Sequence, residues 1–172
     1  ENIILLYGLN IEGNILISVI YELNKNHNKD GKRMKIVINA RLLNERKGGP
    51  YRYQVNILNE LALIDKENTY ILIVNEKISD KFGFLNNPNF KQIVLPFKNR
   101  VLFDYICLPL FSYFKKADIF FFPKTTFAPY IRGKKISLYN DIIYFEKFDY
   151  REFKFFDNLH HKLMIPICAK FS

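Results

Sequence analysis

The sequence predicts an α/β domain: a layered, mainly parallel sheet with helices on both of its faces. Two observations lead to this prediction. Short, unbroken runs of apolar residues recur along the chain, and such runs are typical of strands that are buried on both faces. Between several of them lie segments whose apolar residues recur every three or four positions, which indicates helices. Alternation of the two patterns is typical of a parallel α/β sheet.

The composition is consistent with a folded domain. Of the 172 residues, 49% are hydrophobic and 25% are charged, which suits one domain with or without an appendage. The core is expected to be aromatic, because the chain has 17 Phe and 11 Tyr but no Trp. No apolar run reaches the roughly 18 residues of a membrane-spanning helix. No basic-then-apolar leader opens the sequence, so we expect no signal peptide.

The chain is basic, with a formal net charge of +9. Such a charge fits three kinds of partner: nucleic acid, an anionic membrane surface, or anionic substrates such as lipid-linked phosphates. The lysines are scattered along the sequence and form no block. A generally solvated basic surface is therefore the alternative to all three.

No metal site is predicted. Cys107 and Cys168 belong to no CxxC pair and lie in apolar stretches, so we expect two buried free thiols in a reducing cytoplasm. His160 and His161 are adjacent and lack a third ligand at metal-binding spacing. An Asp-x-Asp motif for a metal-bound sugar nucleotide is also missing from the sequence.

Residues 1–33 are predicted to be an appendage of uncertain origin. A strand at residues 3–7 precedes a helix at residues 14–23, and a polar linker at residues 24–33 follows. The two glycines at Gly8 and Gly13 have the spacing of a phosphate-binding P-loop. Asn14 and Ile15 stand where that loop needs Lys and Ser or Thr, so we reject a P-loop here.

The main domain, residues 34–172, is predicted to open with a strand, a glycine-bearing loop and a helix. The strand covers residues 35–40, a polar loop ends in Gly48-Gly49-Pro50, and helical apolar spacing continues to Ile64. Glycines allow a ligand to approach the backbone N–H groups closely. The helix N-terminus adds partial positive charge, which suits a phosphate or another anion. The alternative is that the glycines only permit a tight turn.

Four more strands and two more helices complete the predicted domain. The strands cover residues 69–74, 91–95, 118–122 and 135–139. In the helix from about residue 151, apolar residues follow at helical steps, at Phe156, Leu159, Leu163 and Ile167. Residues 101–114 are apolar nearly all round and contain Pro109. They are interpreted as a helix buried between the sheet and other helices, or as a membrane-surface helix. We favour the first, because a polar face is almost absent.

Five segments in this order resemble the N-terminal domain of family 4 glycosyltransferases, which are retaining two-domain enzymes of the GT-B fold. They read MKIVINARLL, GGPYRYQVNILNEL, DYICLPLF, ADIFFFPKTTFAP and ISLYNDI. The resemblance covers residues 34–172 and implies a Rossmann-like domain that binds mainly the acceptor. The C-terminal domain, which holds the nucleotide sugar in that family, has no counterpart in this sequence. We therefore expect a chain truncated before the donor domain.

The resemblance assigns residues at the first helix to ligand binding. Gly48 and Gly49 match the family's glycines near the donor diphosphate, and Arg52 is assigned to the same group. Tyr53 matches the tyrosine of the family's Arg-Tyr pair and is assigned to the acceptor. Tyr51, also assigned to the acceptor, replaces the small residue that the family usually has. A bland alternative for Arg52 is an ordinary solvated arginine.

Further along the chain the resemblance assigns a catalytic pair and two acceptor contacts. Asp141 matches the family's aspartate, whereas Asn140 replaces its usual histidine. Asn140 can hydrogen-bond a hydroxyl but cannot carry a proton or a charge near neutral pH. Thr125 and Thr126 are candidates for bonding acceptor hydroxyls, with loop capping as their alternative. Asp141 likewise has the alternative of a helix or turn cap.

The leading prediction for function is transfer of a sugar from a nucleotide-sugar donor to a cell-surface polysaccharide or a lipid-linked acceptor. The expected place is the cytoplasm, at the inner face of the plasma membrane, with no cofactor, no metal and no nucleic acid. Such a reaction needs groups that stabilise the departing diphosphate and hold the acceptor in place. The alternatives are a non-catalytic basic module for anionic membranes or nucleic acid, and an inactive truncated transferase.

Overall fold

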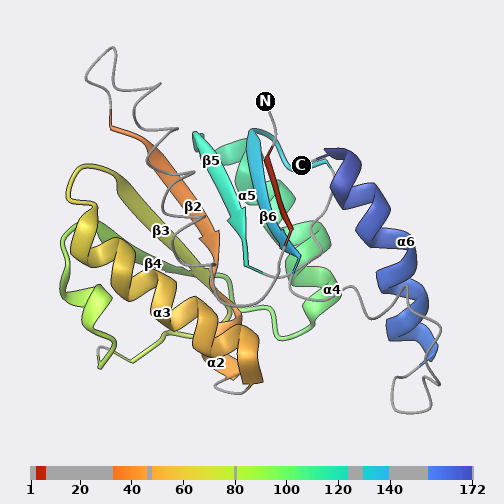
Figure 1. Cartoon of the computed structure of the whole chain (residues 1–172), viewed down its shortest axis with the longest axis horizontal. Helices are drawn as coiled ribbons and strands as arrows, with labels where there is room; N and C mark the ends of the chain where they lie inside the picture. Colours follow the sequence, from red (N-terminus) through yellow and green to blue (C-terminus); the bar gives the residue numbers. More distant parts are fainter. Residues whose placement is uncertain are drawn as a thin grey trace.

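The computed structural model describes residues 3–6, 33–45, 48–79, 81–123, 130–139 and 155–171. Six strands in these ranges form one sheet in the order β1-β6-β5-β2-β3-β4, and every neighbouring pair is parallel (Figure 1). The strands are β1 (Ile3–Leu6), β2 (Lys35–Asn39), β3 (Thr69–Val74), β4 (Phe90–Val94), β5 (Ile119–Phe122) and β6 (Lys134–Tyr139). The predicted α/β fold with a parallel sheet is confirmed.

Helices cover both faces of this sheet. In Figure 1, α3 lies in front of β2 and β3, whereas α5 lies behind β5 and β6. The helical elements are α2 (Leu42–Glu45), α3 (Gly48–Ile64), the 3₁₀ turn η2 (Gly83–Asn86), α4 (Arg100–Leu102), the π-helical turn η3 (Phe103–Cys107), α5 (Leu108–Phe114) and α6 (Phe155–Phe171). No helix within the described ranges is both long enough and apolar enough to cross a bilayer.

Two hydrophobic cores lie on opposite sides of the sheet, which explains why the strands are continuously apolar. Successive side chains of a strand point to opposite faces. Ile36 and Ile38 of β2 pack with α3 in one core. Val37, between them, packs in the other core with Phe103 of η3 and Ile165 of α6.

The region before α3 differs from the predicted loop. A short helix, α2, occupies part of it, and Gly48 and Gly49 form the first turn of α3 itself. Gly48 has a φ of 79°, a conformation that L side chains rarely adopt. The buried face of α3 also includes Gln54, whereas Ile64 at the end of the predicted stripe is exposed.

Residues 100–114 form one helical run whose predicted burial is wrong for its outer face. Asn99 caps the run by accepting hydrogen bonds from the N–H groups of Val101 and Leu102. The π turn widens the helix just before Pro109, which has no N–H to donate. Phe103 and Leu108 are buried against the sheet, but the opposite face is open to solvent. A single helical layer leaves that face uncovered.

Two further expectations are corrected in the same way. Three members of the predicted apolar stripe of α6, Leu159, Leu163 and Ile167, are exposed, while the side chain of Phe156 is outside the described part. Among the described side chains of α6, the buried ones are His161, Ile165 and Cys168. The two cysteines are free, as predicted, but Cys107 is only half-buried.

The first predicted strand belongs to the main sheet. β1 is parallel to β6, with Ile3 opposite Ile136 and Leu6 opposite Tyr139. The predicted helix at residues 14–23 and most of the predicted linker lie outside the described residues. The division of the chain at residue 33 stays a prediction.

Candidate functional site at the carboxyl edge of the sheet

The strand order places a switch point beside β2. From β2 the chain runs to β3 and then β4 on one side, and it later returns to β5 on the other side. In open parallel sheets, ligands bind at the carboxyl ends of the strands where the order reverses in this way. The carboxyl ends of β2 and β5 are therefore the first place to look for a site.

Asn39, the last residue of β2, links three elements at this edge. Its Nδ2 donates to Oδ1 of Asp104 in η3 at 3.0 Å. Its carbonyl oxygen accepts from Nε2 of Gln54 in α3 at 2.8 Å. Its Oδ1 accepts from the backbone N–H of Arg41 at 3.3 Å. The end of β2 is thus held by polar bonds to helices on both faces of the sheet.

Asp104 is the acidic member of this cluster and is only 5% exposed. Nε of Arg100 lies 3.5 Å from its Oδ2. Burial raises the pKa of Asp104, and the opposing effects of Arg41, Asn39 and Arg100 do not cancel that rise. The fold therefore keeps a carboxyl group where ionisation is disfavoured, inside a π turn, and both features are frequent at functional sites.

Arg41 and Gln54 complete the cluster, and both are buried. Nη1 of Arg41 lies 2.7 Å from Oε1 of Glu45, one turn along the chain. Gln54 is 1% exposed, and its Oε1 has no hydrogen-bond partner among the described residues. A buried acceptor without a donor costs about 1–3 kcal/mol, so this oxygen marks an incomplete set of bonds at the carboxyl edge.

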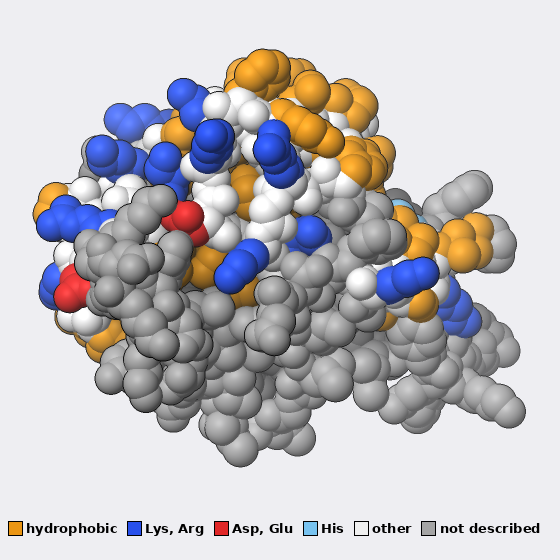
Figure 2. All heavy atoms as spheres, turned by 90° about the horizontal axis from the view of Figure 1, so that it is seen from above, with side chains coloured by type: hydrophobic (Ala, Val, Ile, Leu, Met, Phe, Trp, Pro, Cys, Tyr) orange, Lys and Arg blue, Asp and Glu red, His pale blue; other side chains and the backbone are white. Residues whose placement is uncertain are grey.

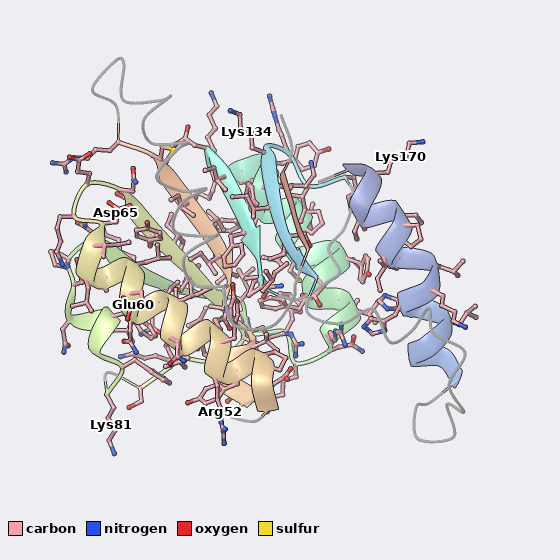
Figure 3. All side chains as sticks on the ribbon, viewed as in Figure 1. Arg52, Glu60, Asp65, Lys81, Lys134 and Lys170 are labelled. Atoms are coloured by element: carbon pink, nitrogen blue, oxygen red, sulfur yellow. The ribbon has the colours of Figure 1, made fainter. Side chains whose placement is uncertain are left out.

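Five of the predicted site residues lie in the first turns of α3, at this same edge. Gly48 and Gly49 are exposed, and a Cβ built on Gly49 would meet no atom within 4 Å. Arg52 is exposed and points away from the sheet (Figure 3). Tyr51 and Tyr53 are half-buried and pack against the core, which leaves only part of each ring for an acceptor.

The other four predicted site residues, Thr125, Thr126, Asn140 and Asp141, lie outside the described residues. The strands that precede them, β5 and β6, run parallel to β2 and end at its carboxyl edge. Their roles stay predictions.

A separate hollow of about 620 Å³ lies between α3 and η2, away from this edge. Two of its asparagines already hold the fold together. Nδ2 of Asn87 donates to the carbonyl of Ala62 at 2.8 Å, and Nδ2 of Asn89 donates to the carbonyl of Asp65 at 3.4 Å. We therefore place the candidate site at the carboxyl edge, where polar groups gather, and not at this hollow.

The sequence prediction missed Asn39, Arg41, Gln54, Arg100 and Asp104. Three of them could have been found from the sequence, because each is a polar residue at a position where the surrounding pattern predicts an apolar one. Asn39 ends an apolar strand, Gln54 falls on the buried stripe of a helix, and Asp104 is the acidic residue within an apolar run. Within the described ranges, no three His, Cys, Asp or Glu side chains gather as metal ligands would.

Comparisons with known proteins add no relative: no protein-family model matches this chain, and no curated protein or solved structure is significantly similar to it. The case for a function rests on the sequence patterns and on the geometry of the carboxyl edge.

Proposed function

We propose that this chain is the acceptor-side half of a retaining glycosyltransferase, which transfers a sugar from a nucleotide-sugar donor to a cell-surface polysaccharide or a lipid-linked acceptor. The observation that carries the proposal is the place of Gly48 and Gly49. They open a helix of 17 residues at the carboxyl edge of a parallel sheet, next to its switch point. The resemblance to family 4 glycosyltransferases supplies the reaction.

The first turn of α3 suits the departing diphosphate. Sugar transfer builds negative charge on that group, and donors already in position stabilise it best. A helix N-terminus offers unpaired backbone N–H groups and partial positive charge. The open space at Gly49 lets an anion come close. Arg52, three residues further along the helix, adds a full positive charge nearby.

The buried cluster suits the acceptor side of the same edge. A sugar hydroxyl both donates and accepts hydrogen bonds, so its site needs oxygen acceptors together with N–H donors. Gln54 and Asp104 supply the oxygens, and Arg41 and Arg100 supply guanidinium donors. A second lobe that carries the nucleotide sugar would close over this edge.

The decisive experiment joins the chain to the coding sequence that follows it and assays transfer from a panel of nucleotide sugars. We expect transfer with the donor's anomeric configuration retained, read by NMR of the product. Arg52→Ala should lower kcat/KM about ten-fold or more, because it removes a charge near the leaving group. Lys81→Ala, an exposed lysine that lies to the left of Arg52 in Figure 3 and outside the first turn of α3, is the matched control.

The chain alone permits a binding test. Titration with inorganic pyrophosphate should shift the backbone amide resonances of residues 48–52 in an NMR spectrum. Weak binding is expected, since pyrophosphate would meet residues 48–52 alone, without contacts from a donor lobe. Shifts confined to other parts of the chain, or inverted stereochemistry in the transfer assay, would overturn the proposal.

A further inference from the structure

The outer face of residues 100–114 carries an exposed apolar stripe. Every exposed side chain between positions 101 and 114 is apolar. The most exposed is Phe114, whose relative accessible surface is 80%. We call this set the outer stripe: Val101, Leu102, Ile106, Leu110, Tyr113 and Phe114. Most of its members follow at steps of three or four residues, so they share one side of the helical run.

The outer stripe is unlike the outer face of α3 on the other side of the sheet. From Tyr51 to Ala62 of α3 the exposed side chains are polar, namely Arg52, Asn56 and Glu60, and exposed apolar side chains occur only at the last two residues, Leu63 and Ile64. Both helical runs have one face on a core. A contiguous apolar patch on a protein surface usually marks an interaction site. Of these two helical layers, only residues 101–114 expose apolar side chains along their whole length.

Basic residues frame the outer stripe at both of its ends. Along the chain, Lys98 and Arg100 precede it and Lys115 and Lys116 follow it. Arg132 lines a hollow together with Tyr113 at its far end, and Lys134 comes two residues after Arg132. We call these six residues the basic rim. Figure 2 shows hydrophobic side chains gathered at one side of the molecule, beside a field of Lys and Arg. Two members of the rim lie near acidic side chains: Arg100 is 3.5 Å from the buried Asp104, and Lys98 is 3.7 Å from Glu76 on the open surface.

A hollow of about 420 Å³ joins the outer stripe to the basic rim. Tyr113 lines it together with Arg33, Lys35, Lys116 and Arg132. Its acidic residue, Asp118, accepts a hydrogen bond from the backbone N–H of Lys35 at 2.7 Å, so that carboxylate already serves the sheet. The hollow thus places cationic side chains directly next to an aromatic surface.

We propose that the outer stripe and the basic rim dock on an anionic lipid bilayer, with residues 100–114 lying in the plane of the interface. Apolar side chains enter the boundary between headgroups and acyl chains, while flanking Lys and Arg meet lipid phosphates. The hollow at Arg132 and Lys116 would take one such phosphate. A run of this length lies on a membrane and does not cross it.

Charge argues against the other occupants of this face. A second copy of the chain would bring its own basic rim against the first, and like charges at an interface disfavour pairing. Nucleic acid would satisfy the cations but leave the aliphatic side chains Leu102, Ile106 and Leu110 without a partner. An anionic bilayer satisfies both parts of the surface.

Docking on a membrane would bring the proposed transferase to a lipid-linked acceptor. This role of the docking surface rests on the proposed function. The helical run passes from α4 at the carboxyl edge of the sheet to α5, which leads into β5 at the amino edge (Figure 1). A protein bound through it would hold the carboxyl edge beside the membrane surface, where a lipid-linked acceptor is presented. The docking itself is tested without any transfer assay, so the two proposals can fail separately.

The test is co-sedimentation of the full chain with vesicles of phosphatidylcholine, alone or mixed with phosphatidylglycerol. We expect binding to the mixed vesicles only. The double variant Leu110→Ser/Phe114→Ser should bind about ten-fold more weakly or worse, because it removes two apolar contacts with the bilayer. The matched control is Leu63→Ser on α3, which is 67% exposed on the other side of the sheet and should bind like the unchanged chain.

Two more measurements sharpen the result. Lys115→Glu/Lys116→Glu should abolish binding to the mixed vesicles, and salt should weaken binding of the unchanged chain. Because the chain has no Trp, Phe114→Trp creates a single reporter. Its fluorescence should shift to the blue on vesicle binding and be quenched by lipids that carry a quencher in the acyl chain.

Three results would overturn the inference. One is a failure to bind mixed vesicles at low salt. Another is equal binding by the Leu110→Ser/Phe114→Ser variant and the Leu63→Ser control. The third is a dimer of the unchanged chain in sedimentation that the stripe variant dissolves, since a second copy would then be the occupant.

Discussion

Two buried polar clusters stand at opposite ends of the sheet, and they differ in what the fold does to their carboxyl groups. Asp65, just after α3, lies at the amino edge (Figure 3), whereas Asp104 lies at the carboxyl edge. Asp65 accepts hydrogen bonds from the backbone N–H groups of Glu67 and Asn68, from Nδ2 of Asn68 at 2.7 Å and from the Tyr70 hydroxyl at 2.6 Å. Asp104 has fewer neutral donors and two arginines.

The pKa values of the two groups move in opposite directions. Burial alone would raise the pKa of Asp65, but the hydrogen bonds from Tyr70, Asn68 and Glu67 outweigh it, and that pKa lies below its usual value. Burial raises the pKa of Asp104 above its usual value despite Arg41, Asn39 and Arg100. The folded state thus favours the charge at Asp65 and disfavours it at Asp104. The comparison teaches that the first cluster stabilises the charged form of its carboxyl group. The second cluster holds a carboxyl group whose charge the fold disfavours, a property frequent at functional sites.

The largest expected effect is that of Asp65→Ala. It removes a buried hub and leaves Asn68 and Tyr70 without their partner, which should cost about 3 kcal/mol of unfolding free energy. Urea unfolding followed by circular dichroism measures it. Tyr70→Phe removes one of the bonds and should cost about half as much. A loss below about 1 kcal/mol for Asp65→Ala would break the assignment of this cluster to the fold.

The second prediction is the pH dependence of two matched variants, Asp65→Asn and Asp104→Asn. A lowered folded pKa contributes stability above the unfolded value, which is 3.8 for Asp65, and that stability is lost as the pH falls through the folded pKa. Asp65→Asn should therefore be less stable than the unchanged chain near neutral pH. This difference in unfolding free energy should disappear as the pH falls through the folded pKa of Asp65.

Asp104→Asn should show the opposite sign. Its raised folded pKa means that ionisation costs stability as the pH rises from 3.8 through the folded value. At neutral pH the variant should be at least as stable as the unchanged chain, because it removes a charge that the folded state disfavours. That advantage should vanish at low pH. If the proposed function holds, Asp104→Asn should also lower sugar transfer about ten-fold or more. If both variants lowered the unfolding free energy equally, the two carboxyl groups would contribute to stability in the same way, and the contrast between the clusters would be wrong.

A third prediction separates the adjacent glycines at the start of α3. Gly48→Ala forces a Cβ into a backbone with φ of 79° and should cost about 1–2 kcal/mol. Gly49→Ala has open space and should be neutral or stabilising by about 0.4–1 kcal/mol. Thermal unfolding compares them. If Gly49→Ala nevertheless weakens pyrophosphate binding, the space at that position is used by a ligand, as proposed.

The smallest expected effect concerns the outer stripe. Phe114→Ser should change the unfolding free energy by no more than about 0.5 kcal/mol, because this side chain is 80% exposed. Leu63→Ser on α3 should behave alike. A marked loss for Phe114→Ser would show that the stripe contributes to the core of this chain, and would weaken its assignment to a membrane.

Local patterns in the sequence were enough to predict the strands and the parallel sheet. Runs such as residues 69–74 and 118–122 are apolar at successive positions because both of their faces are buried. A short stretch of sequence is therefore enough to recognise them. The helix that follows Gly48 was predicted for the same kind of reason. Its capping turn was less clear, since the positive φ of Gly48 depends on how α2 and α3 meet.

The arrangement of the candidate site needed the tertiary structure. Asn39 and Asp104 are 65 positions apart, and their contact follows from the order of strands and the docking of η3, which no short stretch of sequence encodes. The same holds for residues 101–114. Their composition predicts an apolar helix, but which of its faces is buried depends on the elements that pack against each face. Hydrophobic pattern is a property of neighbours along the chain, whereas exposure and pKa are properties of neighbours in space.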